Sequence, residues 1–165
     1  MKNLLIAFII ICATGSLGGC TKGGDQLSLT GAVYTVSSAA DGAQLVPANA
    51  VTSTGSLTGI FDEQANVFTF TLSWTNLWTT AAPDAITGIK FYSPAAKGAN
   101  GTLTHTISFS NSTSATGTIN LGLGGNIGFT ASEKNDLYAG TAYFIIMTTK
   151  YPNGIIRGQL TATKQ

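Results

Sequence analysis

The clearest pattern in the chain is a strict alternation of large apolar and small polar residues over residues 67–74, VFTFTLSW. A period of two places every second side chain on the same face of a β-strand, so the phenylalanines, the leucine and Trp74 are predicted to face a core. Residues 55–61 (GSLTGIF) precede this strand across a polar stretch, residues 62–66, and are predicted to be its hairpin partner. The pattern therefore predicts an antiparallel hairpin with one buried face.

Similar short segments recur along the chain. Further strands are predicted at residues 30–36, 86–92, 102–109, 115–121, 141–149 and 155–163. Within them, residues 143–147 (YFIIM) are apolar on both faces, which indicates a strand that is covered on both sides. Thr130 and Glu133 have the spacing of a capping box and predict a short helix that ends near Gly140. This series predicts an all-β fold, either a sandwich or a Greek-key barrel, with one short helical turn.

The first residues have the composition of a secretory signal. Lys2 is followed by an apolar run over residues 4–13, which is much shorter than the roughly 20 residues that a membrane-spanning helix needs. Leu17-Gly18-Gly19-Cys20 then resembles the lipobox of bacterial lipoproteins, in which the cysteine is acylated and becomes the mature N-terminus. The sequence therefore predicts lipidation at Cys20; the alternative is ordinary secretory cleavage beside an incidental cysteine.

Cleavage before Cys20 would divide the chain into a signal peptide (1–19), a flexible tether (20–28) and a folded domain (29–165). Cys12 would leave with the signal and Cys20 would carry lipid, so no disulfide is expected in the domain. The chain has 8 Lys and Arg against 7 Asp and Glu, so no basic surface for nucleic acid is expected. Stability must come from the apolar core.

The residues available for metal binding or catalysis are few. His105 is the only histidine, whereas a zinc or copper site needs several nitrogen, sulfur or oxygen ligands. The pairs Asp62/Glu63 and Glu133/Asp136 are explained by a polar turn and a helix start, without glycosidase chemistry. No serine has a base beyond His105 to activate it. No catalysis, cofactor or transition metal is expected, and a weak calcium site stays an alternative.

Two aromatic residues are candidates for contacting a ligand. Trp74 is in phase with the apolar face of its strand and is expected in the core. Trp78 follows that strand and is out of phase, so we predict that Trp78 and Tyr92 contact a ligand, as exposed aromatic rings on β-sandwiches do when they stack on sugars. Lys90, two residues before Tyr92, completes this set of candidates.

The segment YPNGIIRGQL near the C-terminus predicts a tight turn. Pro152 presets φ at the first turn position, and Gly154 supplies a positive φ. Residues 141–149 and 155–163 are therefore expected to pair as a hairpin.

The same segment contains the only arginine of the chain, Arg157. A guanidinium offers several donors in a fixed fork, which suits tying several carbonyls or one carboxylate. Gly158 beside it allows the backbone of a neighbour to approach closely. We expect a structural role for Arg157, with Asp136 or Asp62 as its partner.

Five segments of the chain carry a resemblance to a known family. They are GSLTGIFD (55–62), FTFTLSW (68–74), GANG (98–101), DLYAGTAY (136–143) and YPNGIIRGQL (151–160). Together they resemble the CHRD domain, named after chordin, over nearly all of residues 29–163. The resemblance implies an immunoglobulin-like antiparallel β-sandwich of Greek-key type, common in secreted and lipid-anchored bacterial proteins, without established catalytic activity.

The chain departs from this family at positions where polar residues are common. CHRD domains often carry a His-x-His pair where this sequence has Lys90-Phe91-Tyr92, and a His-Thr pair where it has Met147-Thr148. An acidic residue that often precedes Ile-Arg is here Ile155. The missing imidazoles and carboxylate argue against a metal site.

The sequence as a whole predicts a lipid-anchored β-sandwich of the cell envelope, acting as a non-catalytic binding or structural module toward a protein or adhesion partner. One alternative is a carbohydrate-binding module that uses Trp78 and Tyr92. A second alternative is a metal-dependent enzyme. The identity of the partner, the oligomeric state and the membrane face do not follow from the sequence.

Overall fold

The computed structural model describes residues 31–78, 84–108, 115–123 and 128–165. The predicted signal peptide, the lipidation site at Cys20 and the tether lie outside the described residues, as do the first two residues of the predicted domain. Apart from two short helices, the regular structure of the described part is all β.

The described strands are β1 (Val33–Asp41), β2 (Thr54–Asp62), β3 (Val67–Thr75), β4 (Ile86–Ser93), β5 (Thr102–Ile107), β6 (Gly117–Leu123), β7 (Tyr143–Thr148), β8 (Ile156–Gln159) and β9 (Thr161–Lys164). The helices are a 3₁₀ turn, η1 (Gly42–Gln44), and α1 (Ala131–Tyr138). The predicted all-β fold with one short α-helix is confirmed at this level.

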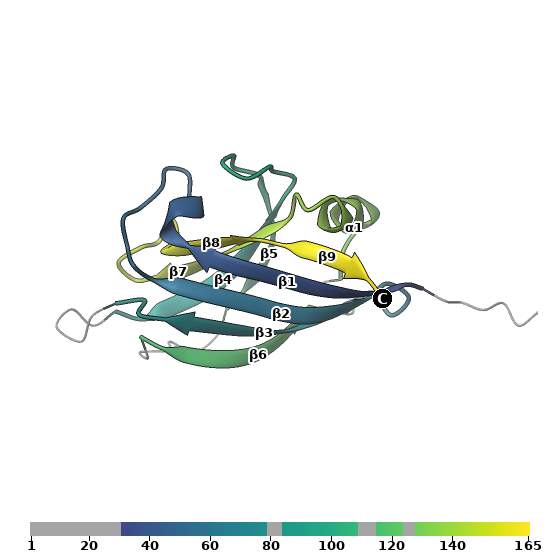
Figure 1. Ribbon diagram of the computed structural model, residues 1–165, viewed down its shortest axis with the longest axis horizontal. Coiled ribbons are helices and arrows are strands. Elements are labelled where there is room, and N and C mark those ends of the chain that lie inside the picture. The colour runs from purple at the N-terminus through teal and green to yellow at the C-terminus, as the bar shows by residue number, and fades with distance from the viewer. Residues whose placement is uncertain (1–30, 79–83, 109–114, 124–127) are drawn as a thin grey trace, which may run out of the picture.

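The nine strands hydrogen-bond in the order β5-β4-β7-β8-β1-β2-β3-β6, and β9 lies beside β1. All pairings between described strands are antiparallel. Figure 1 shows that this sheet curls, so that β1, β2, β3 and β6 form one half and β4, β5 and β7 lie behind them. The two halves enclose the main core.

The predicted hairpin is present as β2 and β3, paired without a break from Thr54↔Thr75 to Asp62↔Val67. Its inward residues, among them Leu57, Phe61 and Leu72, have no exposed surface. In the turn, Asp62 Oδ1 accepts a hydrogen bond of 2.8 Å from the Ala65 amide. Alternation along the sequence thus places one face of this hairpin in the core.

Aromatic rings join the two halves across the core. The Phe70 ring of β3 meets the Phe91 ring of β4 edge-on, with centroids 5.6 Å apart, and Phe68 meets the same ring at 6.4 Å. Burying a large apolar side chain contributes about 1.5–3 kcal/mol. These contacts therefore account for much of the attachment of β3 to β4.

The predicted capping box opens α1. Thr130 Oγ1 accepts from the Glu133 amide at 3.3 Å, and Glu133 Oε2 accepts from the Thr130 amide at 2.6 Å. The helix ends at Tyr138, two residues before Gly140, whose φ is +69°. Leu137 is fully buried and fixes the helix against the core.

Two predicted strand boundaries were wrong. The predicted strand 155–163 is divided at Leu160, because β8 pairs with β7 in one half and β9 pairs with β1 in the other. Leu160 itself is buried at the crossing point. The first strand runs on to Asp41 instead of ending at residue 36, since its last residues pair with β2 although small residues give a weak strand signal.

Strand β7 was predicted to be covered on both sides, and all six of its residues are buried. Phe144 and Ile146 belong to the main core. Tyr143, Ile145 and Met147 point to the other face and form a second cluster with Leu45 and Ala95. The outer face of β4, β7 and β8 therefore has its own cover, which includes the region of Arg157.

Candidate functional site

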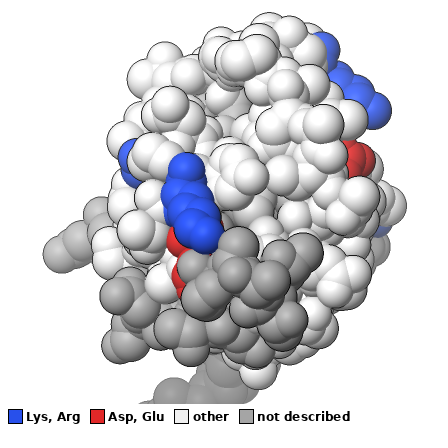
Figure 2. All heavy atoms as spheres, turned by 90° about the vertical axis from the view of Figure 1, so that its left-hand side faces the viewer, with Lys and Arg blue, Asp and Glu red and all other residues white. Residues whose placement is uncertain are grey.

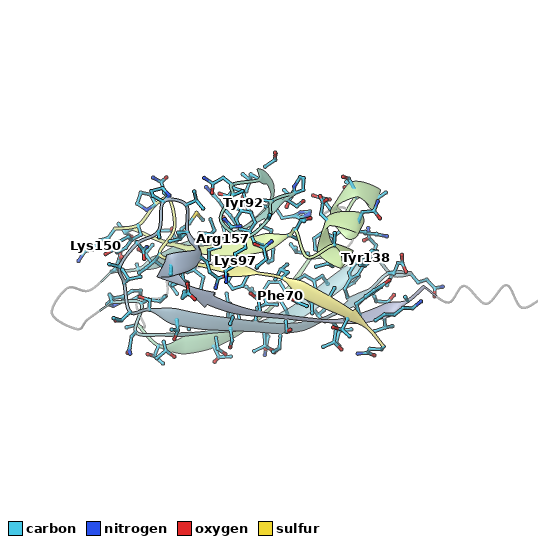
Figure 3. The ribbon with its side chains drawn as sticks, turned by 45° about the horizontal axis from the view of Figure 1, so that its top comes forward. Phe70, Tyr92, Lys97, Tyr138, Lys150 and Arg157 are labelled. Atoms are coloured by element: carbon cyan, nitrogen blue, oxygen red, sulfur yellow. The ribbon has the colours of Figure 1, made fainter. Side chains whose placement is uncertain are left out.

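The guanidinium of Arg157 lies in this second cluster and is almost completely buried, with 1% of the residue exposed. Its Cζ lies 3.6 Å from the centre of the Tyr143 ring, and Tyr143 stacks on Tyr92 of β4 at 5.1 Å and 7°. Figure 3 labels Arg157 and Tyr92, the two outer members of this stack. Such a cation over an aromatic face contributes about 2 kcal/mol when water is excluded. Tyr143 on the central strand thus contacts groups from both neighbouring strands.

Backbone carbonyls between β4 and β5 receive the Arg157 donors. Nη1 donates to the Ala99 carbonyl at 2.6 Å, and Nη2 donates to the Ala96 carbonyl at 3.4 Å and to Gln159 Oε1 at 3.0 Å. The Tyr143 hydroxyl accepts from the Gly101 amide at 2.9 Å. Arg157 and Tyr143 together hold this connection on the sheet.

Gln159 extends the network. Its Nε2 donates to the carbonyls of Ala95 at 2.9 Å, Gly140 at 2.9 Å and Ala142 at 3.2 Å. Its backbone amide donates to Gln44 Oε1 at 3.3 Å. These acceptors lie in η1, in the segment after β4 and in the segment between α1 and β7. The network therefore fixes these three parts of the chain to β8.

Burial changes the acid–base properties of the stacked groups. Desolvation lowers the pKa of Arg157, and the nearby Tyr143 opposes this change. Desolvation raises the pKa of Tyr92, and Tyr143 raises it further. Both shifts disfavour the charged forms, as expected for a site from which water is largely removed.

The prediction that Asp136 or Asp62 pairs with Arg157 was wrong. Asp62 caps the β2–β3 turn, and the backbone carbonyl of Asp136 accepts from the Thr141 amide at 2.8 Å at the end of α1. Asp41 stands opposite Arg157 in the register, and its carboxylate accepts from Gln44. Backbone carbonyls serve Arg157 instead, and they avoid the cost of removing a carboxylate from water.

Gly154 has the positive φ that the turn predicted, whereas Gly158 is approached by side chains of the neighbouring strands and not by their backbone. Gly154 has φ +118°, and an added Cβ would meet Ile145. Gly158 stands opposite both Phe144 and Ala40, and an added Cβ would meet Ser38 Oγ and lie 2.6 Å from Phe144 Cε1. Both glycines allow a close approach that a side chain would prevent.

The structure separates the aromatic ligand candidates. Lys90 and Tyr92 lie two residues apart on β4, so both face the second cluster, where they are half-buried. Trp78 is half-buried against the main core instead. Met147 also faces the second cluster, so Lys90, Tyr92 and Met147 share one face of the sheet.

His105 links β5 to α1. Its Nε2 lies 3.2 Å from Glu133 Oε1, and its ring meets Phe129 edge-on at 5.4 Å. Within the part of the chain that the structure describes, no group of three or more His, Cys, Asp and Glu side chains is placed to hold a metal ion. The contacts of His105 are those of a packing residue.

A second candidate surface is the outer face of β1, β2, β3, β6 and β9. Small hydroxyl and amide side chains stand there in rows across the strands. One row is Thr161, Ser37, Thr58, Thr71 and Asn120, and the next is Thr163, Thr35, Ile60, Thr69 and Gly122. We call this surface the hydroxyl face.

Part of the hydroxyl face forms a shallow hollow, wide open to solvent, with a volume of ≈ 840 Å³. The lining residues are Thr35, Thr58, Gly59, Ile60, Thr69, Phe70, Thr71, Asn120, Leu121 and Gly122. Thr71 Oγ1 donates to Asn120 Oδ1 at 2.7 Å, which orients the amide along the face. We call this hollow the trough; it runs across β1, β2, β3 and β6 and contains no charged side chain.

Sequence reasoning missed the trough although its signal was present. The alternation that places Phe68, Phe70 and Leu72 in the core places Thr69 and Thr71 on the opposite face. The cross-strand register, which brings them beside Thr58 and Asn120, appears only in the structure.

Charged groups are sparse on the described surface. On the end of the molecule shown in Figure 2, isolated basic and acidic side chains lie in a largely uncharged surface. No helix among the described residues is long and apolar enough to cross a membrane.

A family model, that of the CHRD domain, matches residues 36–160. No curated protein and no solved structure matches the chain. The matched region begins in β1 and ends at the buried Leu160, so it contains the Arg157 network and, except for Thr35, the residues that line the trough.

Proposed function

The chain belongs to the CHRD domain family, and from this premise we propose that it is a non-catalytic binding module of the cell envelope, attached to a membrane by lipid on Cys20. The module recognises a neutral partner, a protein or adhesion surface, on the trough of its hydroxyl face. The Arg157 network stabilises the scaffold that presents this face.

The observation that carries the proposal is the uncharged trough. Most of its exposed lining is apolar, including Ile60 with 40% of its surface exposed, and hydroxyl and amide groups add donors and acceptors at regular cross-strand positions. Strands lie about 4.8 Å apart, so a trough across four neighbouring strands extends about 14 Å and suits an elongated ligand. A lack of fixed charge favours a neutral partner over a polyanion.

The finer fold that we propose is the immunoglobulin-like Greek-key sandwich. It is supported by the weak link between the two halves, since β1 and β8 share only the pairs Ala40↔Gly158 and Asp41↔Arg157. The passage from β8 to β9 at Leu160 likewise resembles a strand that changes sheets. A crystal structure in which the β1–β8 pairing extended into one open sheet would contradict this assignment.

Lipid attachment predicts that replacing Cys20 by serine releases the protein from membranes. Buried acyl chains contribute about 0.8 kcal/mol per CH₂, so multiple acylation at Cys20 gives stable attachment that the serine variant lacks. Fractionation of cells that express the full chain should move the protein from the membrane to the soluble fraction. Unchanged size and unchanged membrane partition of the variant would show that Cys20 carries no anchor.

Binding at the trough predicts that Thr58→Arg weakens partner capture at least tenfold. Thr58 is exposed in the first of the two rows, so a long charged side chain at this position occupies the trough while stability changes by about 0.5 kcal/mol or less. The measurement is affinity capture of the full chain from solubilised native envelopes, with bound proteins and glycans quantified by mass spectrometry. The matched control is Thr106→Arg, an exposed threonine of β5 on the other half.

The outcomes of this capture separate the possibilities. Equal capture by wild type and Thr58→Arg would remove the trough as the binding site. Failure of the wild-type chain to enrich any partner would contradict the binding function itself. Loss of a stoichiometric protein with Thr58→Arg alone would support the proposal.

Carbohydrate binding is the second candidate function, and the trough favours it more than the aromatic residues do. The hydroxyl and amide groups within its uncharged, mainly apolar lining can exchange hydrogen bonds with an oligosaccharide of a few units. Trp78 and Tyr92 lie in different clusters and do not form one stacking platform. Enrichment of glycan without protein, lost in Thr58→Arg and retained in Trp78→Ala, would select this candidate.

A further inference from the structure

Strand β6 ends the strand order and pairs with one described neighbour, β3. Its other edge presents backbone N–H and C=O groups that no described strand receives. Its seven residues, GTINLGL, contain neither a charged residue nor a proline. Natural proteins place such residues on exposed edges to prevent pairing between chains, so an edge without them is suited to accept another strand.

The other free edges of the curled sheet are less suited to pairing. The β4–β5 ladder contains an irregularity between Phe91 and Tyr92, and such bulges disturb an edge. Strand β5 also carries His105, which is engaged with Glu133. Strand β9 has four residues and ends in Lys164. By contrast, β6 keeps an unbroken register with β3 over its whole length.

We propose that β6 pairs antiparallel with β6 of a second copy of this chain, giving a dimer with twofold symmetry. Identical strands can pair in this way because a twofold axis makes the same patch complementary to itself. The absence of charge in β6 means that no like charges face each other in the joined ladder. The interface consists of main-chain hydrogen bonds, flanked on the outer face by Thr118, Asn120 and Gly122.

This dimer would lengthen the binding surface. The trough reaches β6 through Asn120, Leu121 and Gly122, so its end lies at the edge that we propose to be joined. A twofold axis beside β6 places the trough of the second copy next to it. One continuous hollow would then cross both copies, and the site within one chain would be half of the complete one.

Cysteine cross-linking of the full chain in native membranes tests the pairing. Thr118→Cys, Asn120→Cys and Gly122→Cys are oxidised singly and as co-expressed pairs, because the twofold axis either makes one of them face its own copy or, when it passes through an inward residue, sets two of them opposite each other within disulfide distance. At least one of these variants or pairs should give a cross-linked dimer on a denaturing gel. The matched control is Ser56→Cys, exposed on the same outer face but in β2, where a neighbouring strand lies on both sides. Dimer yields at or below the Ser56→Cys level for every β6 variant would overturn the proposal.

A charge on the edge should separate the copies. Gly122 is exposed, and an added Cβ would make only ordinary contacts, the nearest at 3.5 Å, so Gly122→Lys should fold normally. We expect a weakening of self-association of at least tenfold, measured by sedimentation of the detergent-solubilised full chain. Thr69→Lys lies in the same row on β3 and should leave the dimer intact. A monomeric wild type, or equal association of wild type and Gly122→Lys, would contradict the pairing.

Discussion

The Arg157→Ala protein is expected to lose about 2–5 kcal/mol of unfolding free energy, the range for truncating a large buried side chain, which lowers its melting temperature by on the order of 10 °C. Truncation leaves the carbonyls of Ala96 and Ala99 without their buried donor and removes the cation from the Tyr143 ring. It also opens a cavity at a residue that is 1% exposed. Urea unfolding of wild type and variant, with equal slopes, measures the loss.

Two companion variants separate charge from geometry. Arg157→Lys keeps the charge but loses the planar fork, so it should recover only part of the stability. Gln159→Leu removes a separate set of bonds to three carbonyls, and a double-mutant cycle with Arg157→Ala should show coupling because Arg157 Nη2 donates to Gln159 Oε1. An Arg157→Ala protein with unchanged melting temperature and lost partner capture would instead make Arg157 a ligand-binding residue.

Local patterns in the sequence correctly predicted the strands, helix and turn whose structure depends on residues close together in the chain. The period-two alternation identified β3 and its partner β2, and the Thr130–Glu133 spacing identified α1. The turn with Gly154 joined β7 and β8 as expected. In each case the residues that determine the structure are neighbours in the chain.

The features that escaped prediction depend on contacts between distant residues. The carbonyls that receive Arg157 lie about sixty residues away in a connection, and a carbonyl has no signature in the sequence. The division at Leu160 depends on which strand lies beside each part. The trough depends on the register of β1, β2, β3 and β6.

The two outer surfaces of the curled sheet differ in how far the described residues cover them. The face of β4, β7 and β8 is covered by connections tied to Arg157 and Gln159, and its aromatic rings are stacked on one another. The hydroxyl face has no such cover among the described residues, and Thr58 and Thr69 remain exposed. The described residues therefore cover the first surface and leave the second uncovered, as the proposed binding at the trough requires.

Gly158→Val is expected to lower the free energy of unfolding by about 3 kcal/mol or more, the upper end of the range that is typical of overpacking. Gly158 lies where β8 contacts both β7 and β1, and a side chain there would meet Ser38 Oγ, Phe144 Cε1 and the Cβ of Ala40. Because only two residue pairs join β1 to β8, the strands cannot separate there without loss of their connection.

Thermal unfolding of Gly158→Val beside Gly122→Ala tests this expectation. Gly122 is also a strand glycine, but an added Cβ there makes ordinary contacts, so Gly122→Ala should change stability by about 0.5 kcal/mol or less. A Gly158→Val protein as stable as Gly122→Ala would mean that β1 and β8 can move apart, and that the main core holds the halves together without the close packing at this junction. A large loss of stability in Gly158→Val alone would instead show that the short junction between β1 and β8 contributes much of the stability of the protein.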